Sequence, residues 1–162
     1  MFTVEDGTGL DNSNALISAE EFQAFASDRG EDISAFDETA QQAAIVVASV
    51  NYIDTFYTFK GDALEADQAM QLPTNEVSIN TKIKLACYEA ALLQLKNRLF
   101  VNPTELTSAG PVSSKSDSVG SLSTSRTYAE GYERTSTYPT VMIDRLLQPY
   151  TLAQGMGTVK RW

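Results

Sequence analysis

The side chains that could do chemistry in this chain of 162 residues are mostly carboxylates, and their spacing does not support catalysis. Glu20 with Glu21 and Glu31 with Asp32 are adjacent pairs, but neighbours on a helix point in different directions. The sequence contains no histidine, which is the commonest general base and transition-metal ligand. It also lacks the glycine-rich motifs that cradle nucleotide phosphates. We therefore expect no enzyme, no cofactor and no metal site.

Two further candidates for chemistry are also weak. The segment "DGTGLDNSN", residues 6–14, mixes oxygen ligands with glycines, but it lacks the calcium-loop spacing that ends in a glutamate. Cys87 is the only cysteine and lies in the apolar run "IKLACYEAALL". A cysteine in such a run is typically a small buried side chain rather than a reactive thiol.

Aromatic residues gather in one stretch that could stack nucleobases, comprising Tyr52, Phe56, Tyr57 and Phe59. Only Lys60 lies beside them in the sequence, and Asp54 and Asp62 are near. Proteins that bind single-stranded DNA need cations interleaved with aromatic rings. On the sequence alone, this stretch is therefore a poor phosphate groove.

The charge is distributed unevenly along the chain, whose formal net charge is −9. Up to Asp67 there are fourteen acids and two bases, a net of −12, and the remainder has seven acids and ten bases, a net of +3. Either the front of the chain forms an acidic solvated face, or it complements the basic back of a neighbouring copy. No apolar run approaches the roughly 20 residues that span a bilayer, so we expect no membrane contact.

Helical signals dominate the chain. Ser18 and Glu21 have capping-box spacing and predict a helix over 19–28 that stops at Gly30. Asp37 can cap a second helix, and Asn80 or Thr81 can start a third, nearly all-apolar helix that should be central. The remaining predictions are a core stripe on the second helix at Ala43, Val47, Val50 and Phe56 or Tyr57, and a short helix between Pro139 and Pro149.

The stretch from Thr107 to Thr127 differs in composition, since thirteen of its twenty-one residues are Ser, Thr or Gly. It predicts a long loop or a weak β-hairpin turning at Val119 and Gly120. The expected fold is mainly α: a small helical bundle with a central apolar helix, a Ser/Gly-rich arm and an extended C-terminal tail. We expect one domain over 1–150, with the arm at 107–128, and a tail over 151–162.

Four stretches in order carry a resemblance to a known family: "VEDGTGLDNSNALISAEEFQAFASDRG", "DQAMQLP", "GPVSSKSDSVGSLSTSRTY" and "IDRLLQPY". Together they resemble the head-to-tail adaptor proteins of tailed bacteriophages, a family also described as DnaT-like single-stranded-DNA-binding proteins. The family's V-x-D-G-(T/S)-G-L start matches residues 4–10. Its mid-chain "QxLxWPR" is similar to Gln68, Met70, Leu72 and Pro73, although Leu72 replaces the tryptophan and Thr74 the arginine.

This resemblance implies a structural protein of the virion, made in the cytoplasm of the bacterial host and placed at the portal vertex or neck. Its partners would be the portal protein, neighbouring copies in a dodecameric ring, and a downstream tail, nozzle or stopper protein. Double-stranded DNA would pass through the lumen without sequence-specific binding. The implied portal-binding tail comprises Gln154, Met156, Val159, Lys160, Arg161 and Trp162. The implied inter-subunit arm comprises Val112, Lys115, Val119, Leu122, Arg126 and Tyr128.

Two alternatives stay open. The chain could bind single-stranded DNA, as the second description of the family indicates, or it could be another tail-completion or neck protein. A mostly helical fold would exclude a β-rich head-decoration protein.

Overall fold

The computed structural model describes residues 1–100, 112–118, 123–128 and 140–152. The chain divides into two compact units, Met1–Leu99 with Pro139–Trp162, and Phe100–Tyr138. The expected division into a 1–150 domain and a 151–162 tail stays a prediction, because residues 153–162 lie outside the described part.

The described elements are mostly helices, so the predicted mainly α class is confirmed. In chain order they are α1 (Ala19–Asp28), α2 (Glu38–Val46), the π-helix η1 (Val47–Asp54), α3 (Thr81–Leu95), the strands β1 (Val112–Ser118) and β2 (Ser123–Tyr128), and α5 (Val141–Leu147). Within the described residues, no helix is both long and apolar enough to cross a membrane.

The three helix starts that were predicted from capping side chains lie where those side chains place them. Ser18 accepts a hydrogen bond from the backbone of Glu21, whose side chain accepts one in return from the backbone of Ser18. Asp37 caps α2, and Asn80 caps α3 through bonds from the first-turn backbone. These side chains satisfy backbone donors that a helix start otherwise leaves without a partner. Gly30 then takes a left-handed conformation just after α1.

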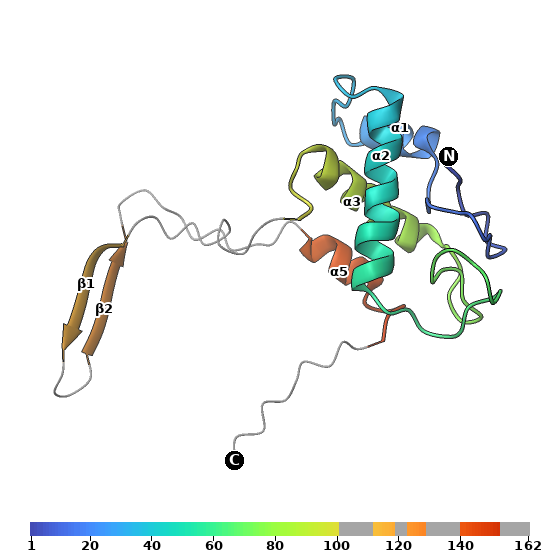
Figure 1. Cartoon of the computed structure of the whole chain (residues 1–162). Coiled ribbons are helices and arrows are strands. Elements are labelled where there is room, and N and C mark those ends of the chain that lie inside the picture. The colour runs from blue at the N-terminus through green and yellow to red at the C-terminus, as the bar shows by residue number, and fades with distance from the viewer. Residues whose placement is uncertain (101–111, 119–122, 129–139, 153–162) are drawn as a thin grey trace, which may run out of the picture. The chain divides into compact units, whose positions relative to one another are not determined.

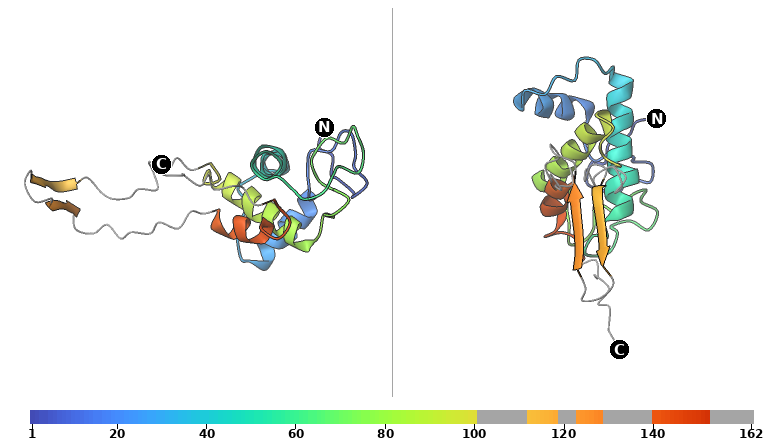
Figure 2. Two further views of the ribbon diagram at one scale, coloured as in Figure 1. Left: turned by 90° about the horizontal axis from the view of Figure 1, so that it is seen from below. Right: turned by 90° about the vertical axis from the view of Figure 1, so that its left-hand side faces the viewer.

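Helix α3 is the centre of the first unit, as its apolar sequence predicts. It contacts α1, α2, η1 and α5, and in Figure 1 it passes behind the continuous rod formed by α2 and η1. Figure 2 shows α5 running beside α3. Its buried residues are Ile83, Ala86, Cys87, Ala90, Ala91, Leu92 and Leu95. The small residues among these let the neighbouring helices pack closely on several sides.

The predicted core stripe on the second helix is wrong in part. Ala43 and Phe56 are exposed, and Val47 and Val50 are only partly buried. The buried residues of α2 and η1 are instead Gln41, Ala44, Ile45, Ala48, Ser49, Tyr52 and Ile53. At Ala43 the prediction chose the wrong face of α2, whose buried side includes Ala44 and Ile45. From Val47 on, the stripe assumed α-helical spacing, whereas a π-helix closes its turn over five residues and so changes which side chains face inward.

Two polar side chains hold the loops beside the helices. The buried carboxylate of Glu5 accepts backbone bonds within residues 7–10 and a bond from Ser13. Gln68 donates to the carbonyl oxygens of Met70, Gln71 and Pro73 and accepts from the backbone of residues 64 and 65. Gln68 of the mid-chain motif and Glu5, which occupies the variable second position of the N-terminal motif, thus have structural roles in the first unit.

The second unit contains the antiparallel pair β1 and β2. In the register, Lys115 lies opposite Arg126, and Val112 lies opposite Tyr128, with an irregularity after Val112. The expected turn at Val119 and Gly120 lies outside the described residues.

Candidate nucleic-acid interface

The residues predicted to meet partners are mostly outside the described part of the chain. Val119, Leu122 and the whole tail set from Gln154 to Trp162 lie there, so those positions stay predictions. Val112, Lys115, Arg126 and Tyr128 belong to β1 and β2, where only their pairing is described. The structure places a different set of residues around a pocket in the first unit.

An open pocket of about 720 Å³ lies where the segment after η1 meets α5 and the residues that follow α5. Its lining combines one aromatic ring, two cations, one carboxylate, one amide, one hydroxyl and one exposed apolar side chain. These residues are Tyr57, Lys60, Asp144, Arg145, Gln148, Thr151 and Leu152.

Backbone hydrogen bonds fix the two walls of this pocket to each other. The N–H of Lys60 donates to the carbonyl of Tyr150 over 3.0 Å, and the N–H of Leu152 donates to the carbonyl of Thr58 over 2.8 Å. Phe59 and Thr151 form an antiparallel bridge between these bonds. Segments about ninety residues apart therefore form one surface whose geometry is set by paired backbone.

The aromatic side of the pocket comes from the segment that follows η1, supported by a residue near the end of η1. Tyr52 and Tyr57 are five residues apart, and their rings meet edge to face with centroids 5.9 Å apart. Tyr52 also contacts the ring of Phe56 at 5.4 Å. The buried Tyr52 ring, from η1, supports the half-buried ring of Tyr57, which lies three residues beyond the end of η1 and lines the pocket. Phe59 is buried in the core and takes no part in this surface.

Polar contacts then orient the lining. The Tyr57 hydroxyl donates to Oδ1 of Asp144 over 2.5 Å. Burial raises the pKa of Tyr57, and the bond to Asp144 raises it further, so the phenol stays neutral. Nζ of Lys60 donates to the carbonyl of Pro149 over 2.7 Å, which holds the ammonium beside the pocket without neutralising it.

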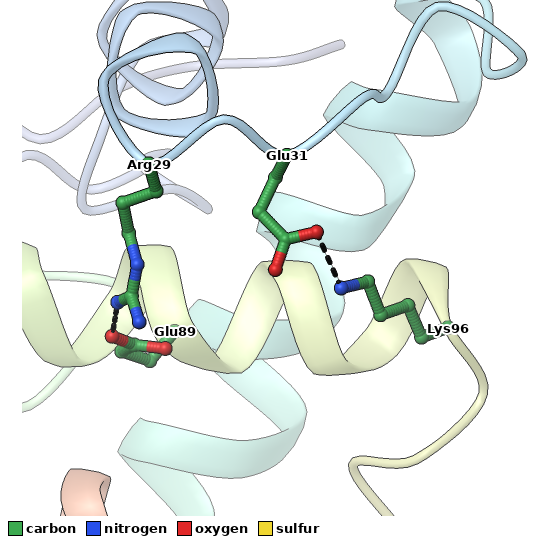
Figure 3. A network of polar contacts seen from close by, with 4 residues as sticks. All are labelled: Arg29, Glu31, Glu89 and Lys96. Carbon is green, nitrogen blue, oxygen red and sulfur yellow. Dashed lines mark hydrogen bonds and ion pairs between the residues drawn. The ribbon is translucent and has the colours of Figure 1, made fainter.

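Several other cations are neutralised by ion pairs that fasten α1 and the following segment to α3. Figure 3 shows two of these pairs, in which side chains from the end of α1 and beyond reach down to α3. The pairs are Arg29 with Glu89, Lys96 with Glu31 at 2.7 Å, and, outside the figure, Lys84 with Glu21 at 2.6 Å. A cation held by a carboxylate is less available to a phosphate.

Four lysine and arginine residues with described side chains form no ion pair: Lys60, Lys82, Arg98 and Arg145. Lys60 and Arg145 line the pocket, whereas Lys82 and Arg98 do not. The pocket therefore brings two cations together with the Tyr57 ring. That combination suits a ligand with a phosphate and a flat base.

Sequence reasoning found half of this site. It identified Tyr57 and Lys60 and judged them a poor groove because no second cation lies near them in the sequence. The structure supplies Arg145, with Gln148 one turn further on, from the other end of the chain. The sequence does place Arg145 on a short helix that ends before Pro149. It does not indicate which other segment of the chain that helix packs against.

The comparisons with known proteins give one match. A family model described as "Putative DnaT-like ssDNA binding protein" matches residues 1–161. No curated protein and no solved structure matches the chain.

This match overturns the expectation of a head-to-tail adaptor. It indicates single-stranded DNA, which was the alternative, and gives no support to a dodecameric connector ring in the neck of a virion. The expected partners are wrong with it: the portal protein, neighbouring ring copies, a downstream tail protein and double-stranded DNA in a lumen. The error arose because the resemblance was taken to imply an adaptor rather than the family's other description. Within the motif stretches, Glu5 and Gln68 form hydrogen bonds that build loops of the first unit.

Proposed function

We propose that this chain, which belongs to the family described as "Putative DnaT-like ssDNA binding protein", binds single-stranded DNA at the pocket beside α5. The observation that carries the proposal is that Lys60, Arg145 and the ring of Tyr57 line the same pocket. Binding rather than catalysis is the proposed activity.

Different residues of the lining would contact the phosphate backbone of the DNA and its bases. The Arg145 guanidinium and the Lys60 ammonium offer several N–H donors to the non-bridging oxygens of a phosphate. The Tyr57 ring and the exposed Leu152 side chain offer apolar surface against which a base can lie. Stacking of one base on an aromatic ring contributes about 1–3 kcal/mol and tolerates any sequence.

The acidic character of the chain shapes this binding. A formal net charge of −9 repels a polyanion at a distance, so attraction must come from the local pair of cations. A duplex brings a second phosphate strand and keeps its bases stacked away from Tyr57. We therefore expect a clear preference for single strands over duplex, with affinity that falls as salt rises.

Fluorescence anisotropy with a labelled single-stranded 12-mer of mixed sequence tests the proposal. The substitution Arg145→Gln removes one cation of the pocket, and Arg98→Gln makes the same change at an exposed arginine outside it. We expect Arg145→Gln to weaken binding about five-fold, the equivalent of about 1 kcal/mol for one exposed charge contact. The plot of log K against log salt should also become shallower by about 0.7.

The control Arg98→Gln should bind like the original chain. Equal losses of affinity for the 12-mer in the two variants would show that the pocket is not the DNA-binding site. No binding of the 12-mer by the original chain at about 50 mM salt, where electrostatic binding is favoured, would reject the function itself.

The finer architecture belongs to this proposal as well. We propose that the helical unit is a small bundle, that residues 107–128 act as an arm, and that residues 151–162 extend as a tail. Location in the virion after synthesis in the cytoplasm of a bacterial host stays a prediction.

A further inference from the structure

The pocket contains a carboxylate where a site built only for phosphate would have none. Asp144 is exposed, and its Oδ1 accepts the hydrogen bond from Tyr57. Its other oxygen, Oδ2, accepts no hydrogen bond from any described residue. Asp144 therefore adds to the lining of the pocket an acceptor oxygen that is not hydrogen-bonded to any described residue.

A carboxylate limits what can lie against it. An ionised carboxylate only accepts hydrogen bonds, and it repels both phosphate and carbonyl oxygens. The phosphate of a bound nucleotide must therefore lie toward Arg145 and Lys60, which leaves the base to meet Asp144. The atom of the base that faces Oδ2 must be a hydrogen-bond donor.

The four DNA bases differ in this property. Cytosine and adenine carry exocyclic amino groups, and guanine carries an amino group next to a ring N–H. Thymine has no amino group, and its single N–H lies between two carbonyl oxygens that a carboxylate would repel. Gln148, whose amide both donates and accepts, can bond to the edge of any base and so does not discriminate.

We propose that Asp144 makes this pocket selective for amino-bearing bases, so that single strands rich in cytosine or adenine bind more tightly than strands of thymine. This inference rests on the proposed function, since it takes the pocket as the site of single-stranded DNA. It assigns to Asp144 a specificity role, and to Tyr57 the role of orienting the carboxylate through the 2.5 Å bond.

The test compares oligo(dC) and oligo(dT) of the same length, because both are pyrimidines with the same charge. We expect the original chain to bind oligo(dC) at least about five-fold more tightly, the lower end of what one good base contact contributes. Asp144→Asn keeps an oxygen to accept from Tyr57 and presents an amide that can turn its N–H toward the carbonyl O4 of thymine. In this variant the ratio should fall to about one or reverse.

A matched control separates base selection from the general effect of removing an acid. Asp62→Asn changes an exposed acid outside the pocket lining. It should leave the ratio of the two affinities unchanged. Thermal unfolding of each variant establishes that it is folded when its ratio is measured.

The outcomes distinguish the two proposals. Equal affinities for oligo(dC) and oligo(dT) in the original chain, or a preference for thymine, would overturn the inference and leave the proposed function intact. A preference for oligo(dC) that survives in Asp144→Asn would also overturn it. Failure of the original chain to bind any of the oligonucleotides would instead reject the proposed function.

Discussion

The loop that begins the chain depends on one buried carboxylate, and its removal gives a prediction that the structure makes quantitative. Glu5 is 5% exposed. Its two oxygens accept four hydrogen bonds, from the N–H groups of Gly7, Gly9 and Leu10 at 2.9–3.0 Å and from the Ser13 hydroxyl at 2.7 Å. The bonds from Gly9 and Ser13 are buried, so in the folded chain these donors depend on the carboxylate rather than on solvent.

The substitution Glu5→Ala leaves these donors without their acceptor. Each buried donor that loses its partner costs about 1–3 kcal/mol. Ser13 can turn toward the carbonyl of Leu10, 3.4 Å away, which recovers part of its cost. Counting Gly9 fully and Ser13 in part, we expect a loss of about 2–4 kcal/mol in the free energy of unfolding.

Urea unfolding followed by far-ultraviolet circular dichroism measures this loss. Asp11→Ala is the matched control, because Asp11 is exposed and its side chain forms no hydrogen bond with a described residue. That control should cost less than about 0.5 kcal/mol. Glu5→Gln should lie between the two, since it keeps one acceptor oxygen but turns an amide N–H toward the N–H of Leu10. Equal stability of Glu5→Ala and Asp11→Ala would refute the argument that this carboxylate builds the loop.

Two further predictions concern the same unit. Burial raises the pKa of Cys87 to about 12, so the folded chain keeps its thiol proton where the unfolded chain loses it. Stability should therefore fall as pH rises from about 9 toward 12, and Cys87→Ala should abolish that part of the slope in unfolding titrations. Gly7 and Gly9 both have positive φ, but only at Gly9 would a Cβ lie 2.9 Å from the Gln68 side chain. Gly9→Ala should therefore lower the melting temperature more than Gly7→Ala, and equal shifts would contradict this.

The parts of the fold that follow from neighbouring residues could be predicted from the sequence. The capping box of Ser18 and Glu21 and the cap at Asn80 each act within one turn, so their spacing alone places the helix starts. The apolar composition of α3 likewise determines that it is packed on most sides.

The register of η1 could not be predicted, because it depends on contacts between distant segments. Ser49 is fully buried, accepts a hydrogen bond from the N–H of Leu16 and lies 3.3 Å from the sulfur of Cys87. A serine facing inward contradicts the apolar stripe that helical spacing predicts. The bonds to Leu16 and Cys87 compensate its burial, and neither partner is near Ser49 in the sequence.

The pocket shows why the charges that lie near one another in the sequence are not the charges that meet in space. By sequence, the ring of Tyr57 has one cation and two acids beside it. In space, Asp54 accepts a hydrogen bond from the backbone of Gln71 and does not line the pocket, whereas α5 brings both Arg145 and Asp144 to it.

The ion pairs then decide which cations remain available. Arg29, Lys84 and Lys96 form ion pairs with carboxylates of the acidic front half or of α3. These pairs neutralise part of the acidic excess within the first unit. Lys60 and Arg145 line the pocket and form no ion pair with a described residue. Under the proposed function, an acidic chain binds a polyanion at the pocket that both cations line. Attraction at contact distance depends on the nearest charges, whereas distant charges are screened beyond about 8–10 Å at moderate salt.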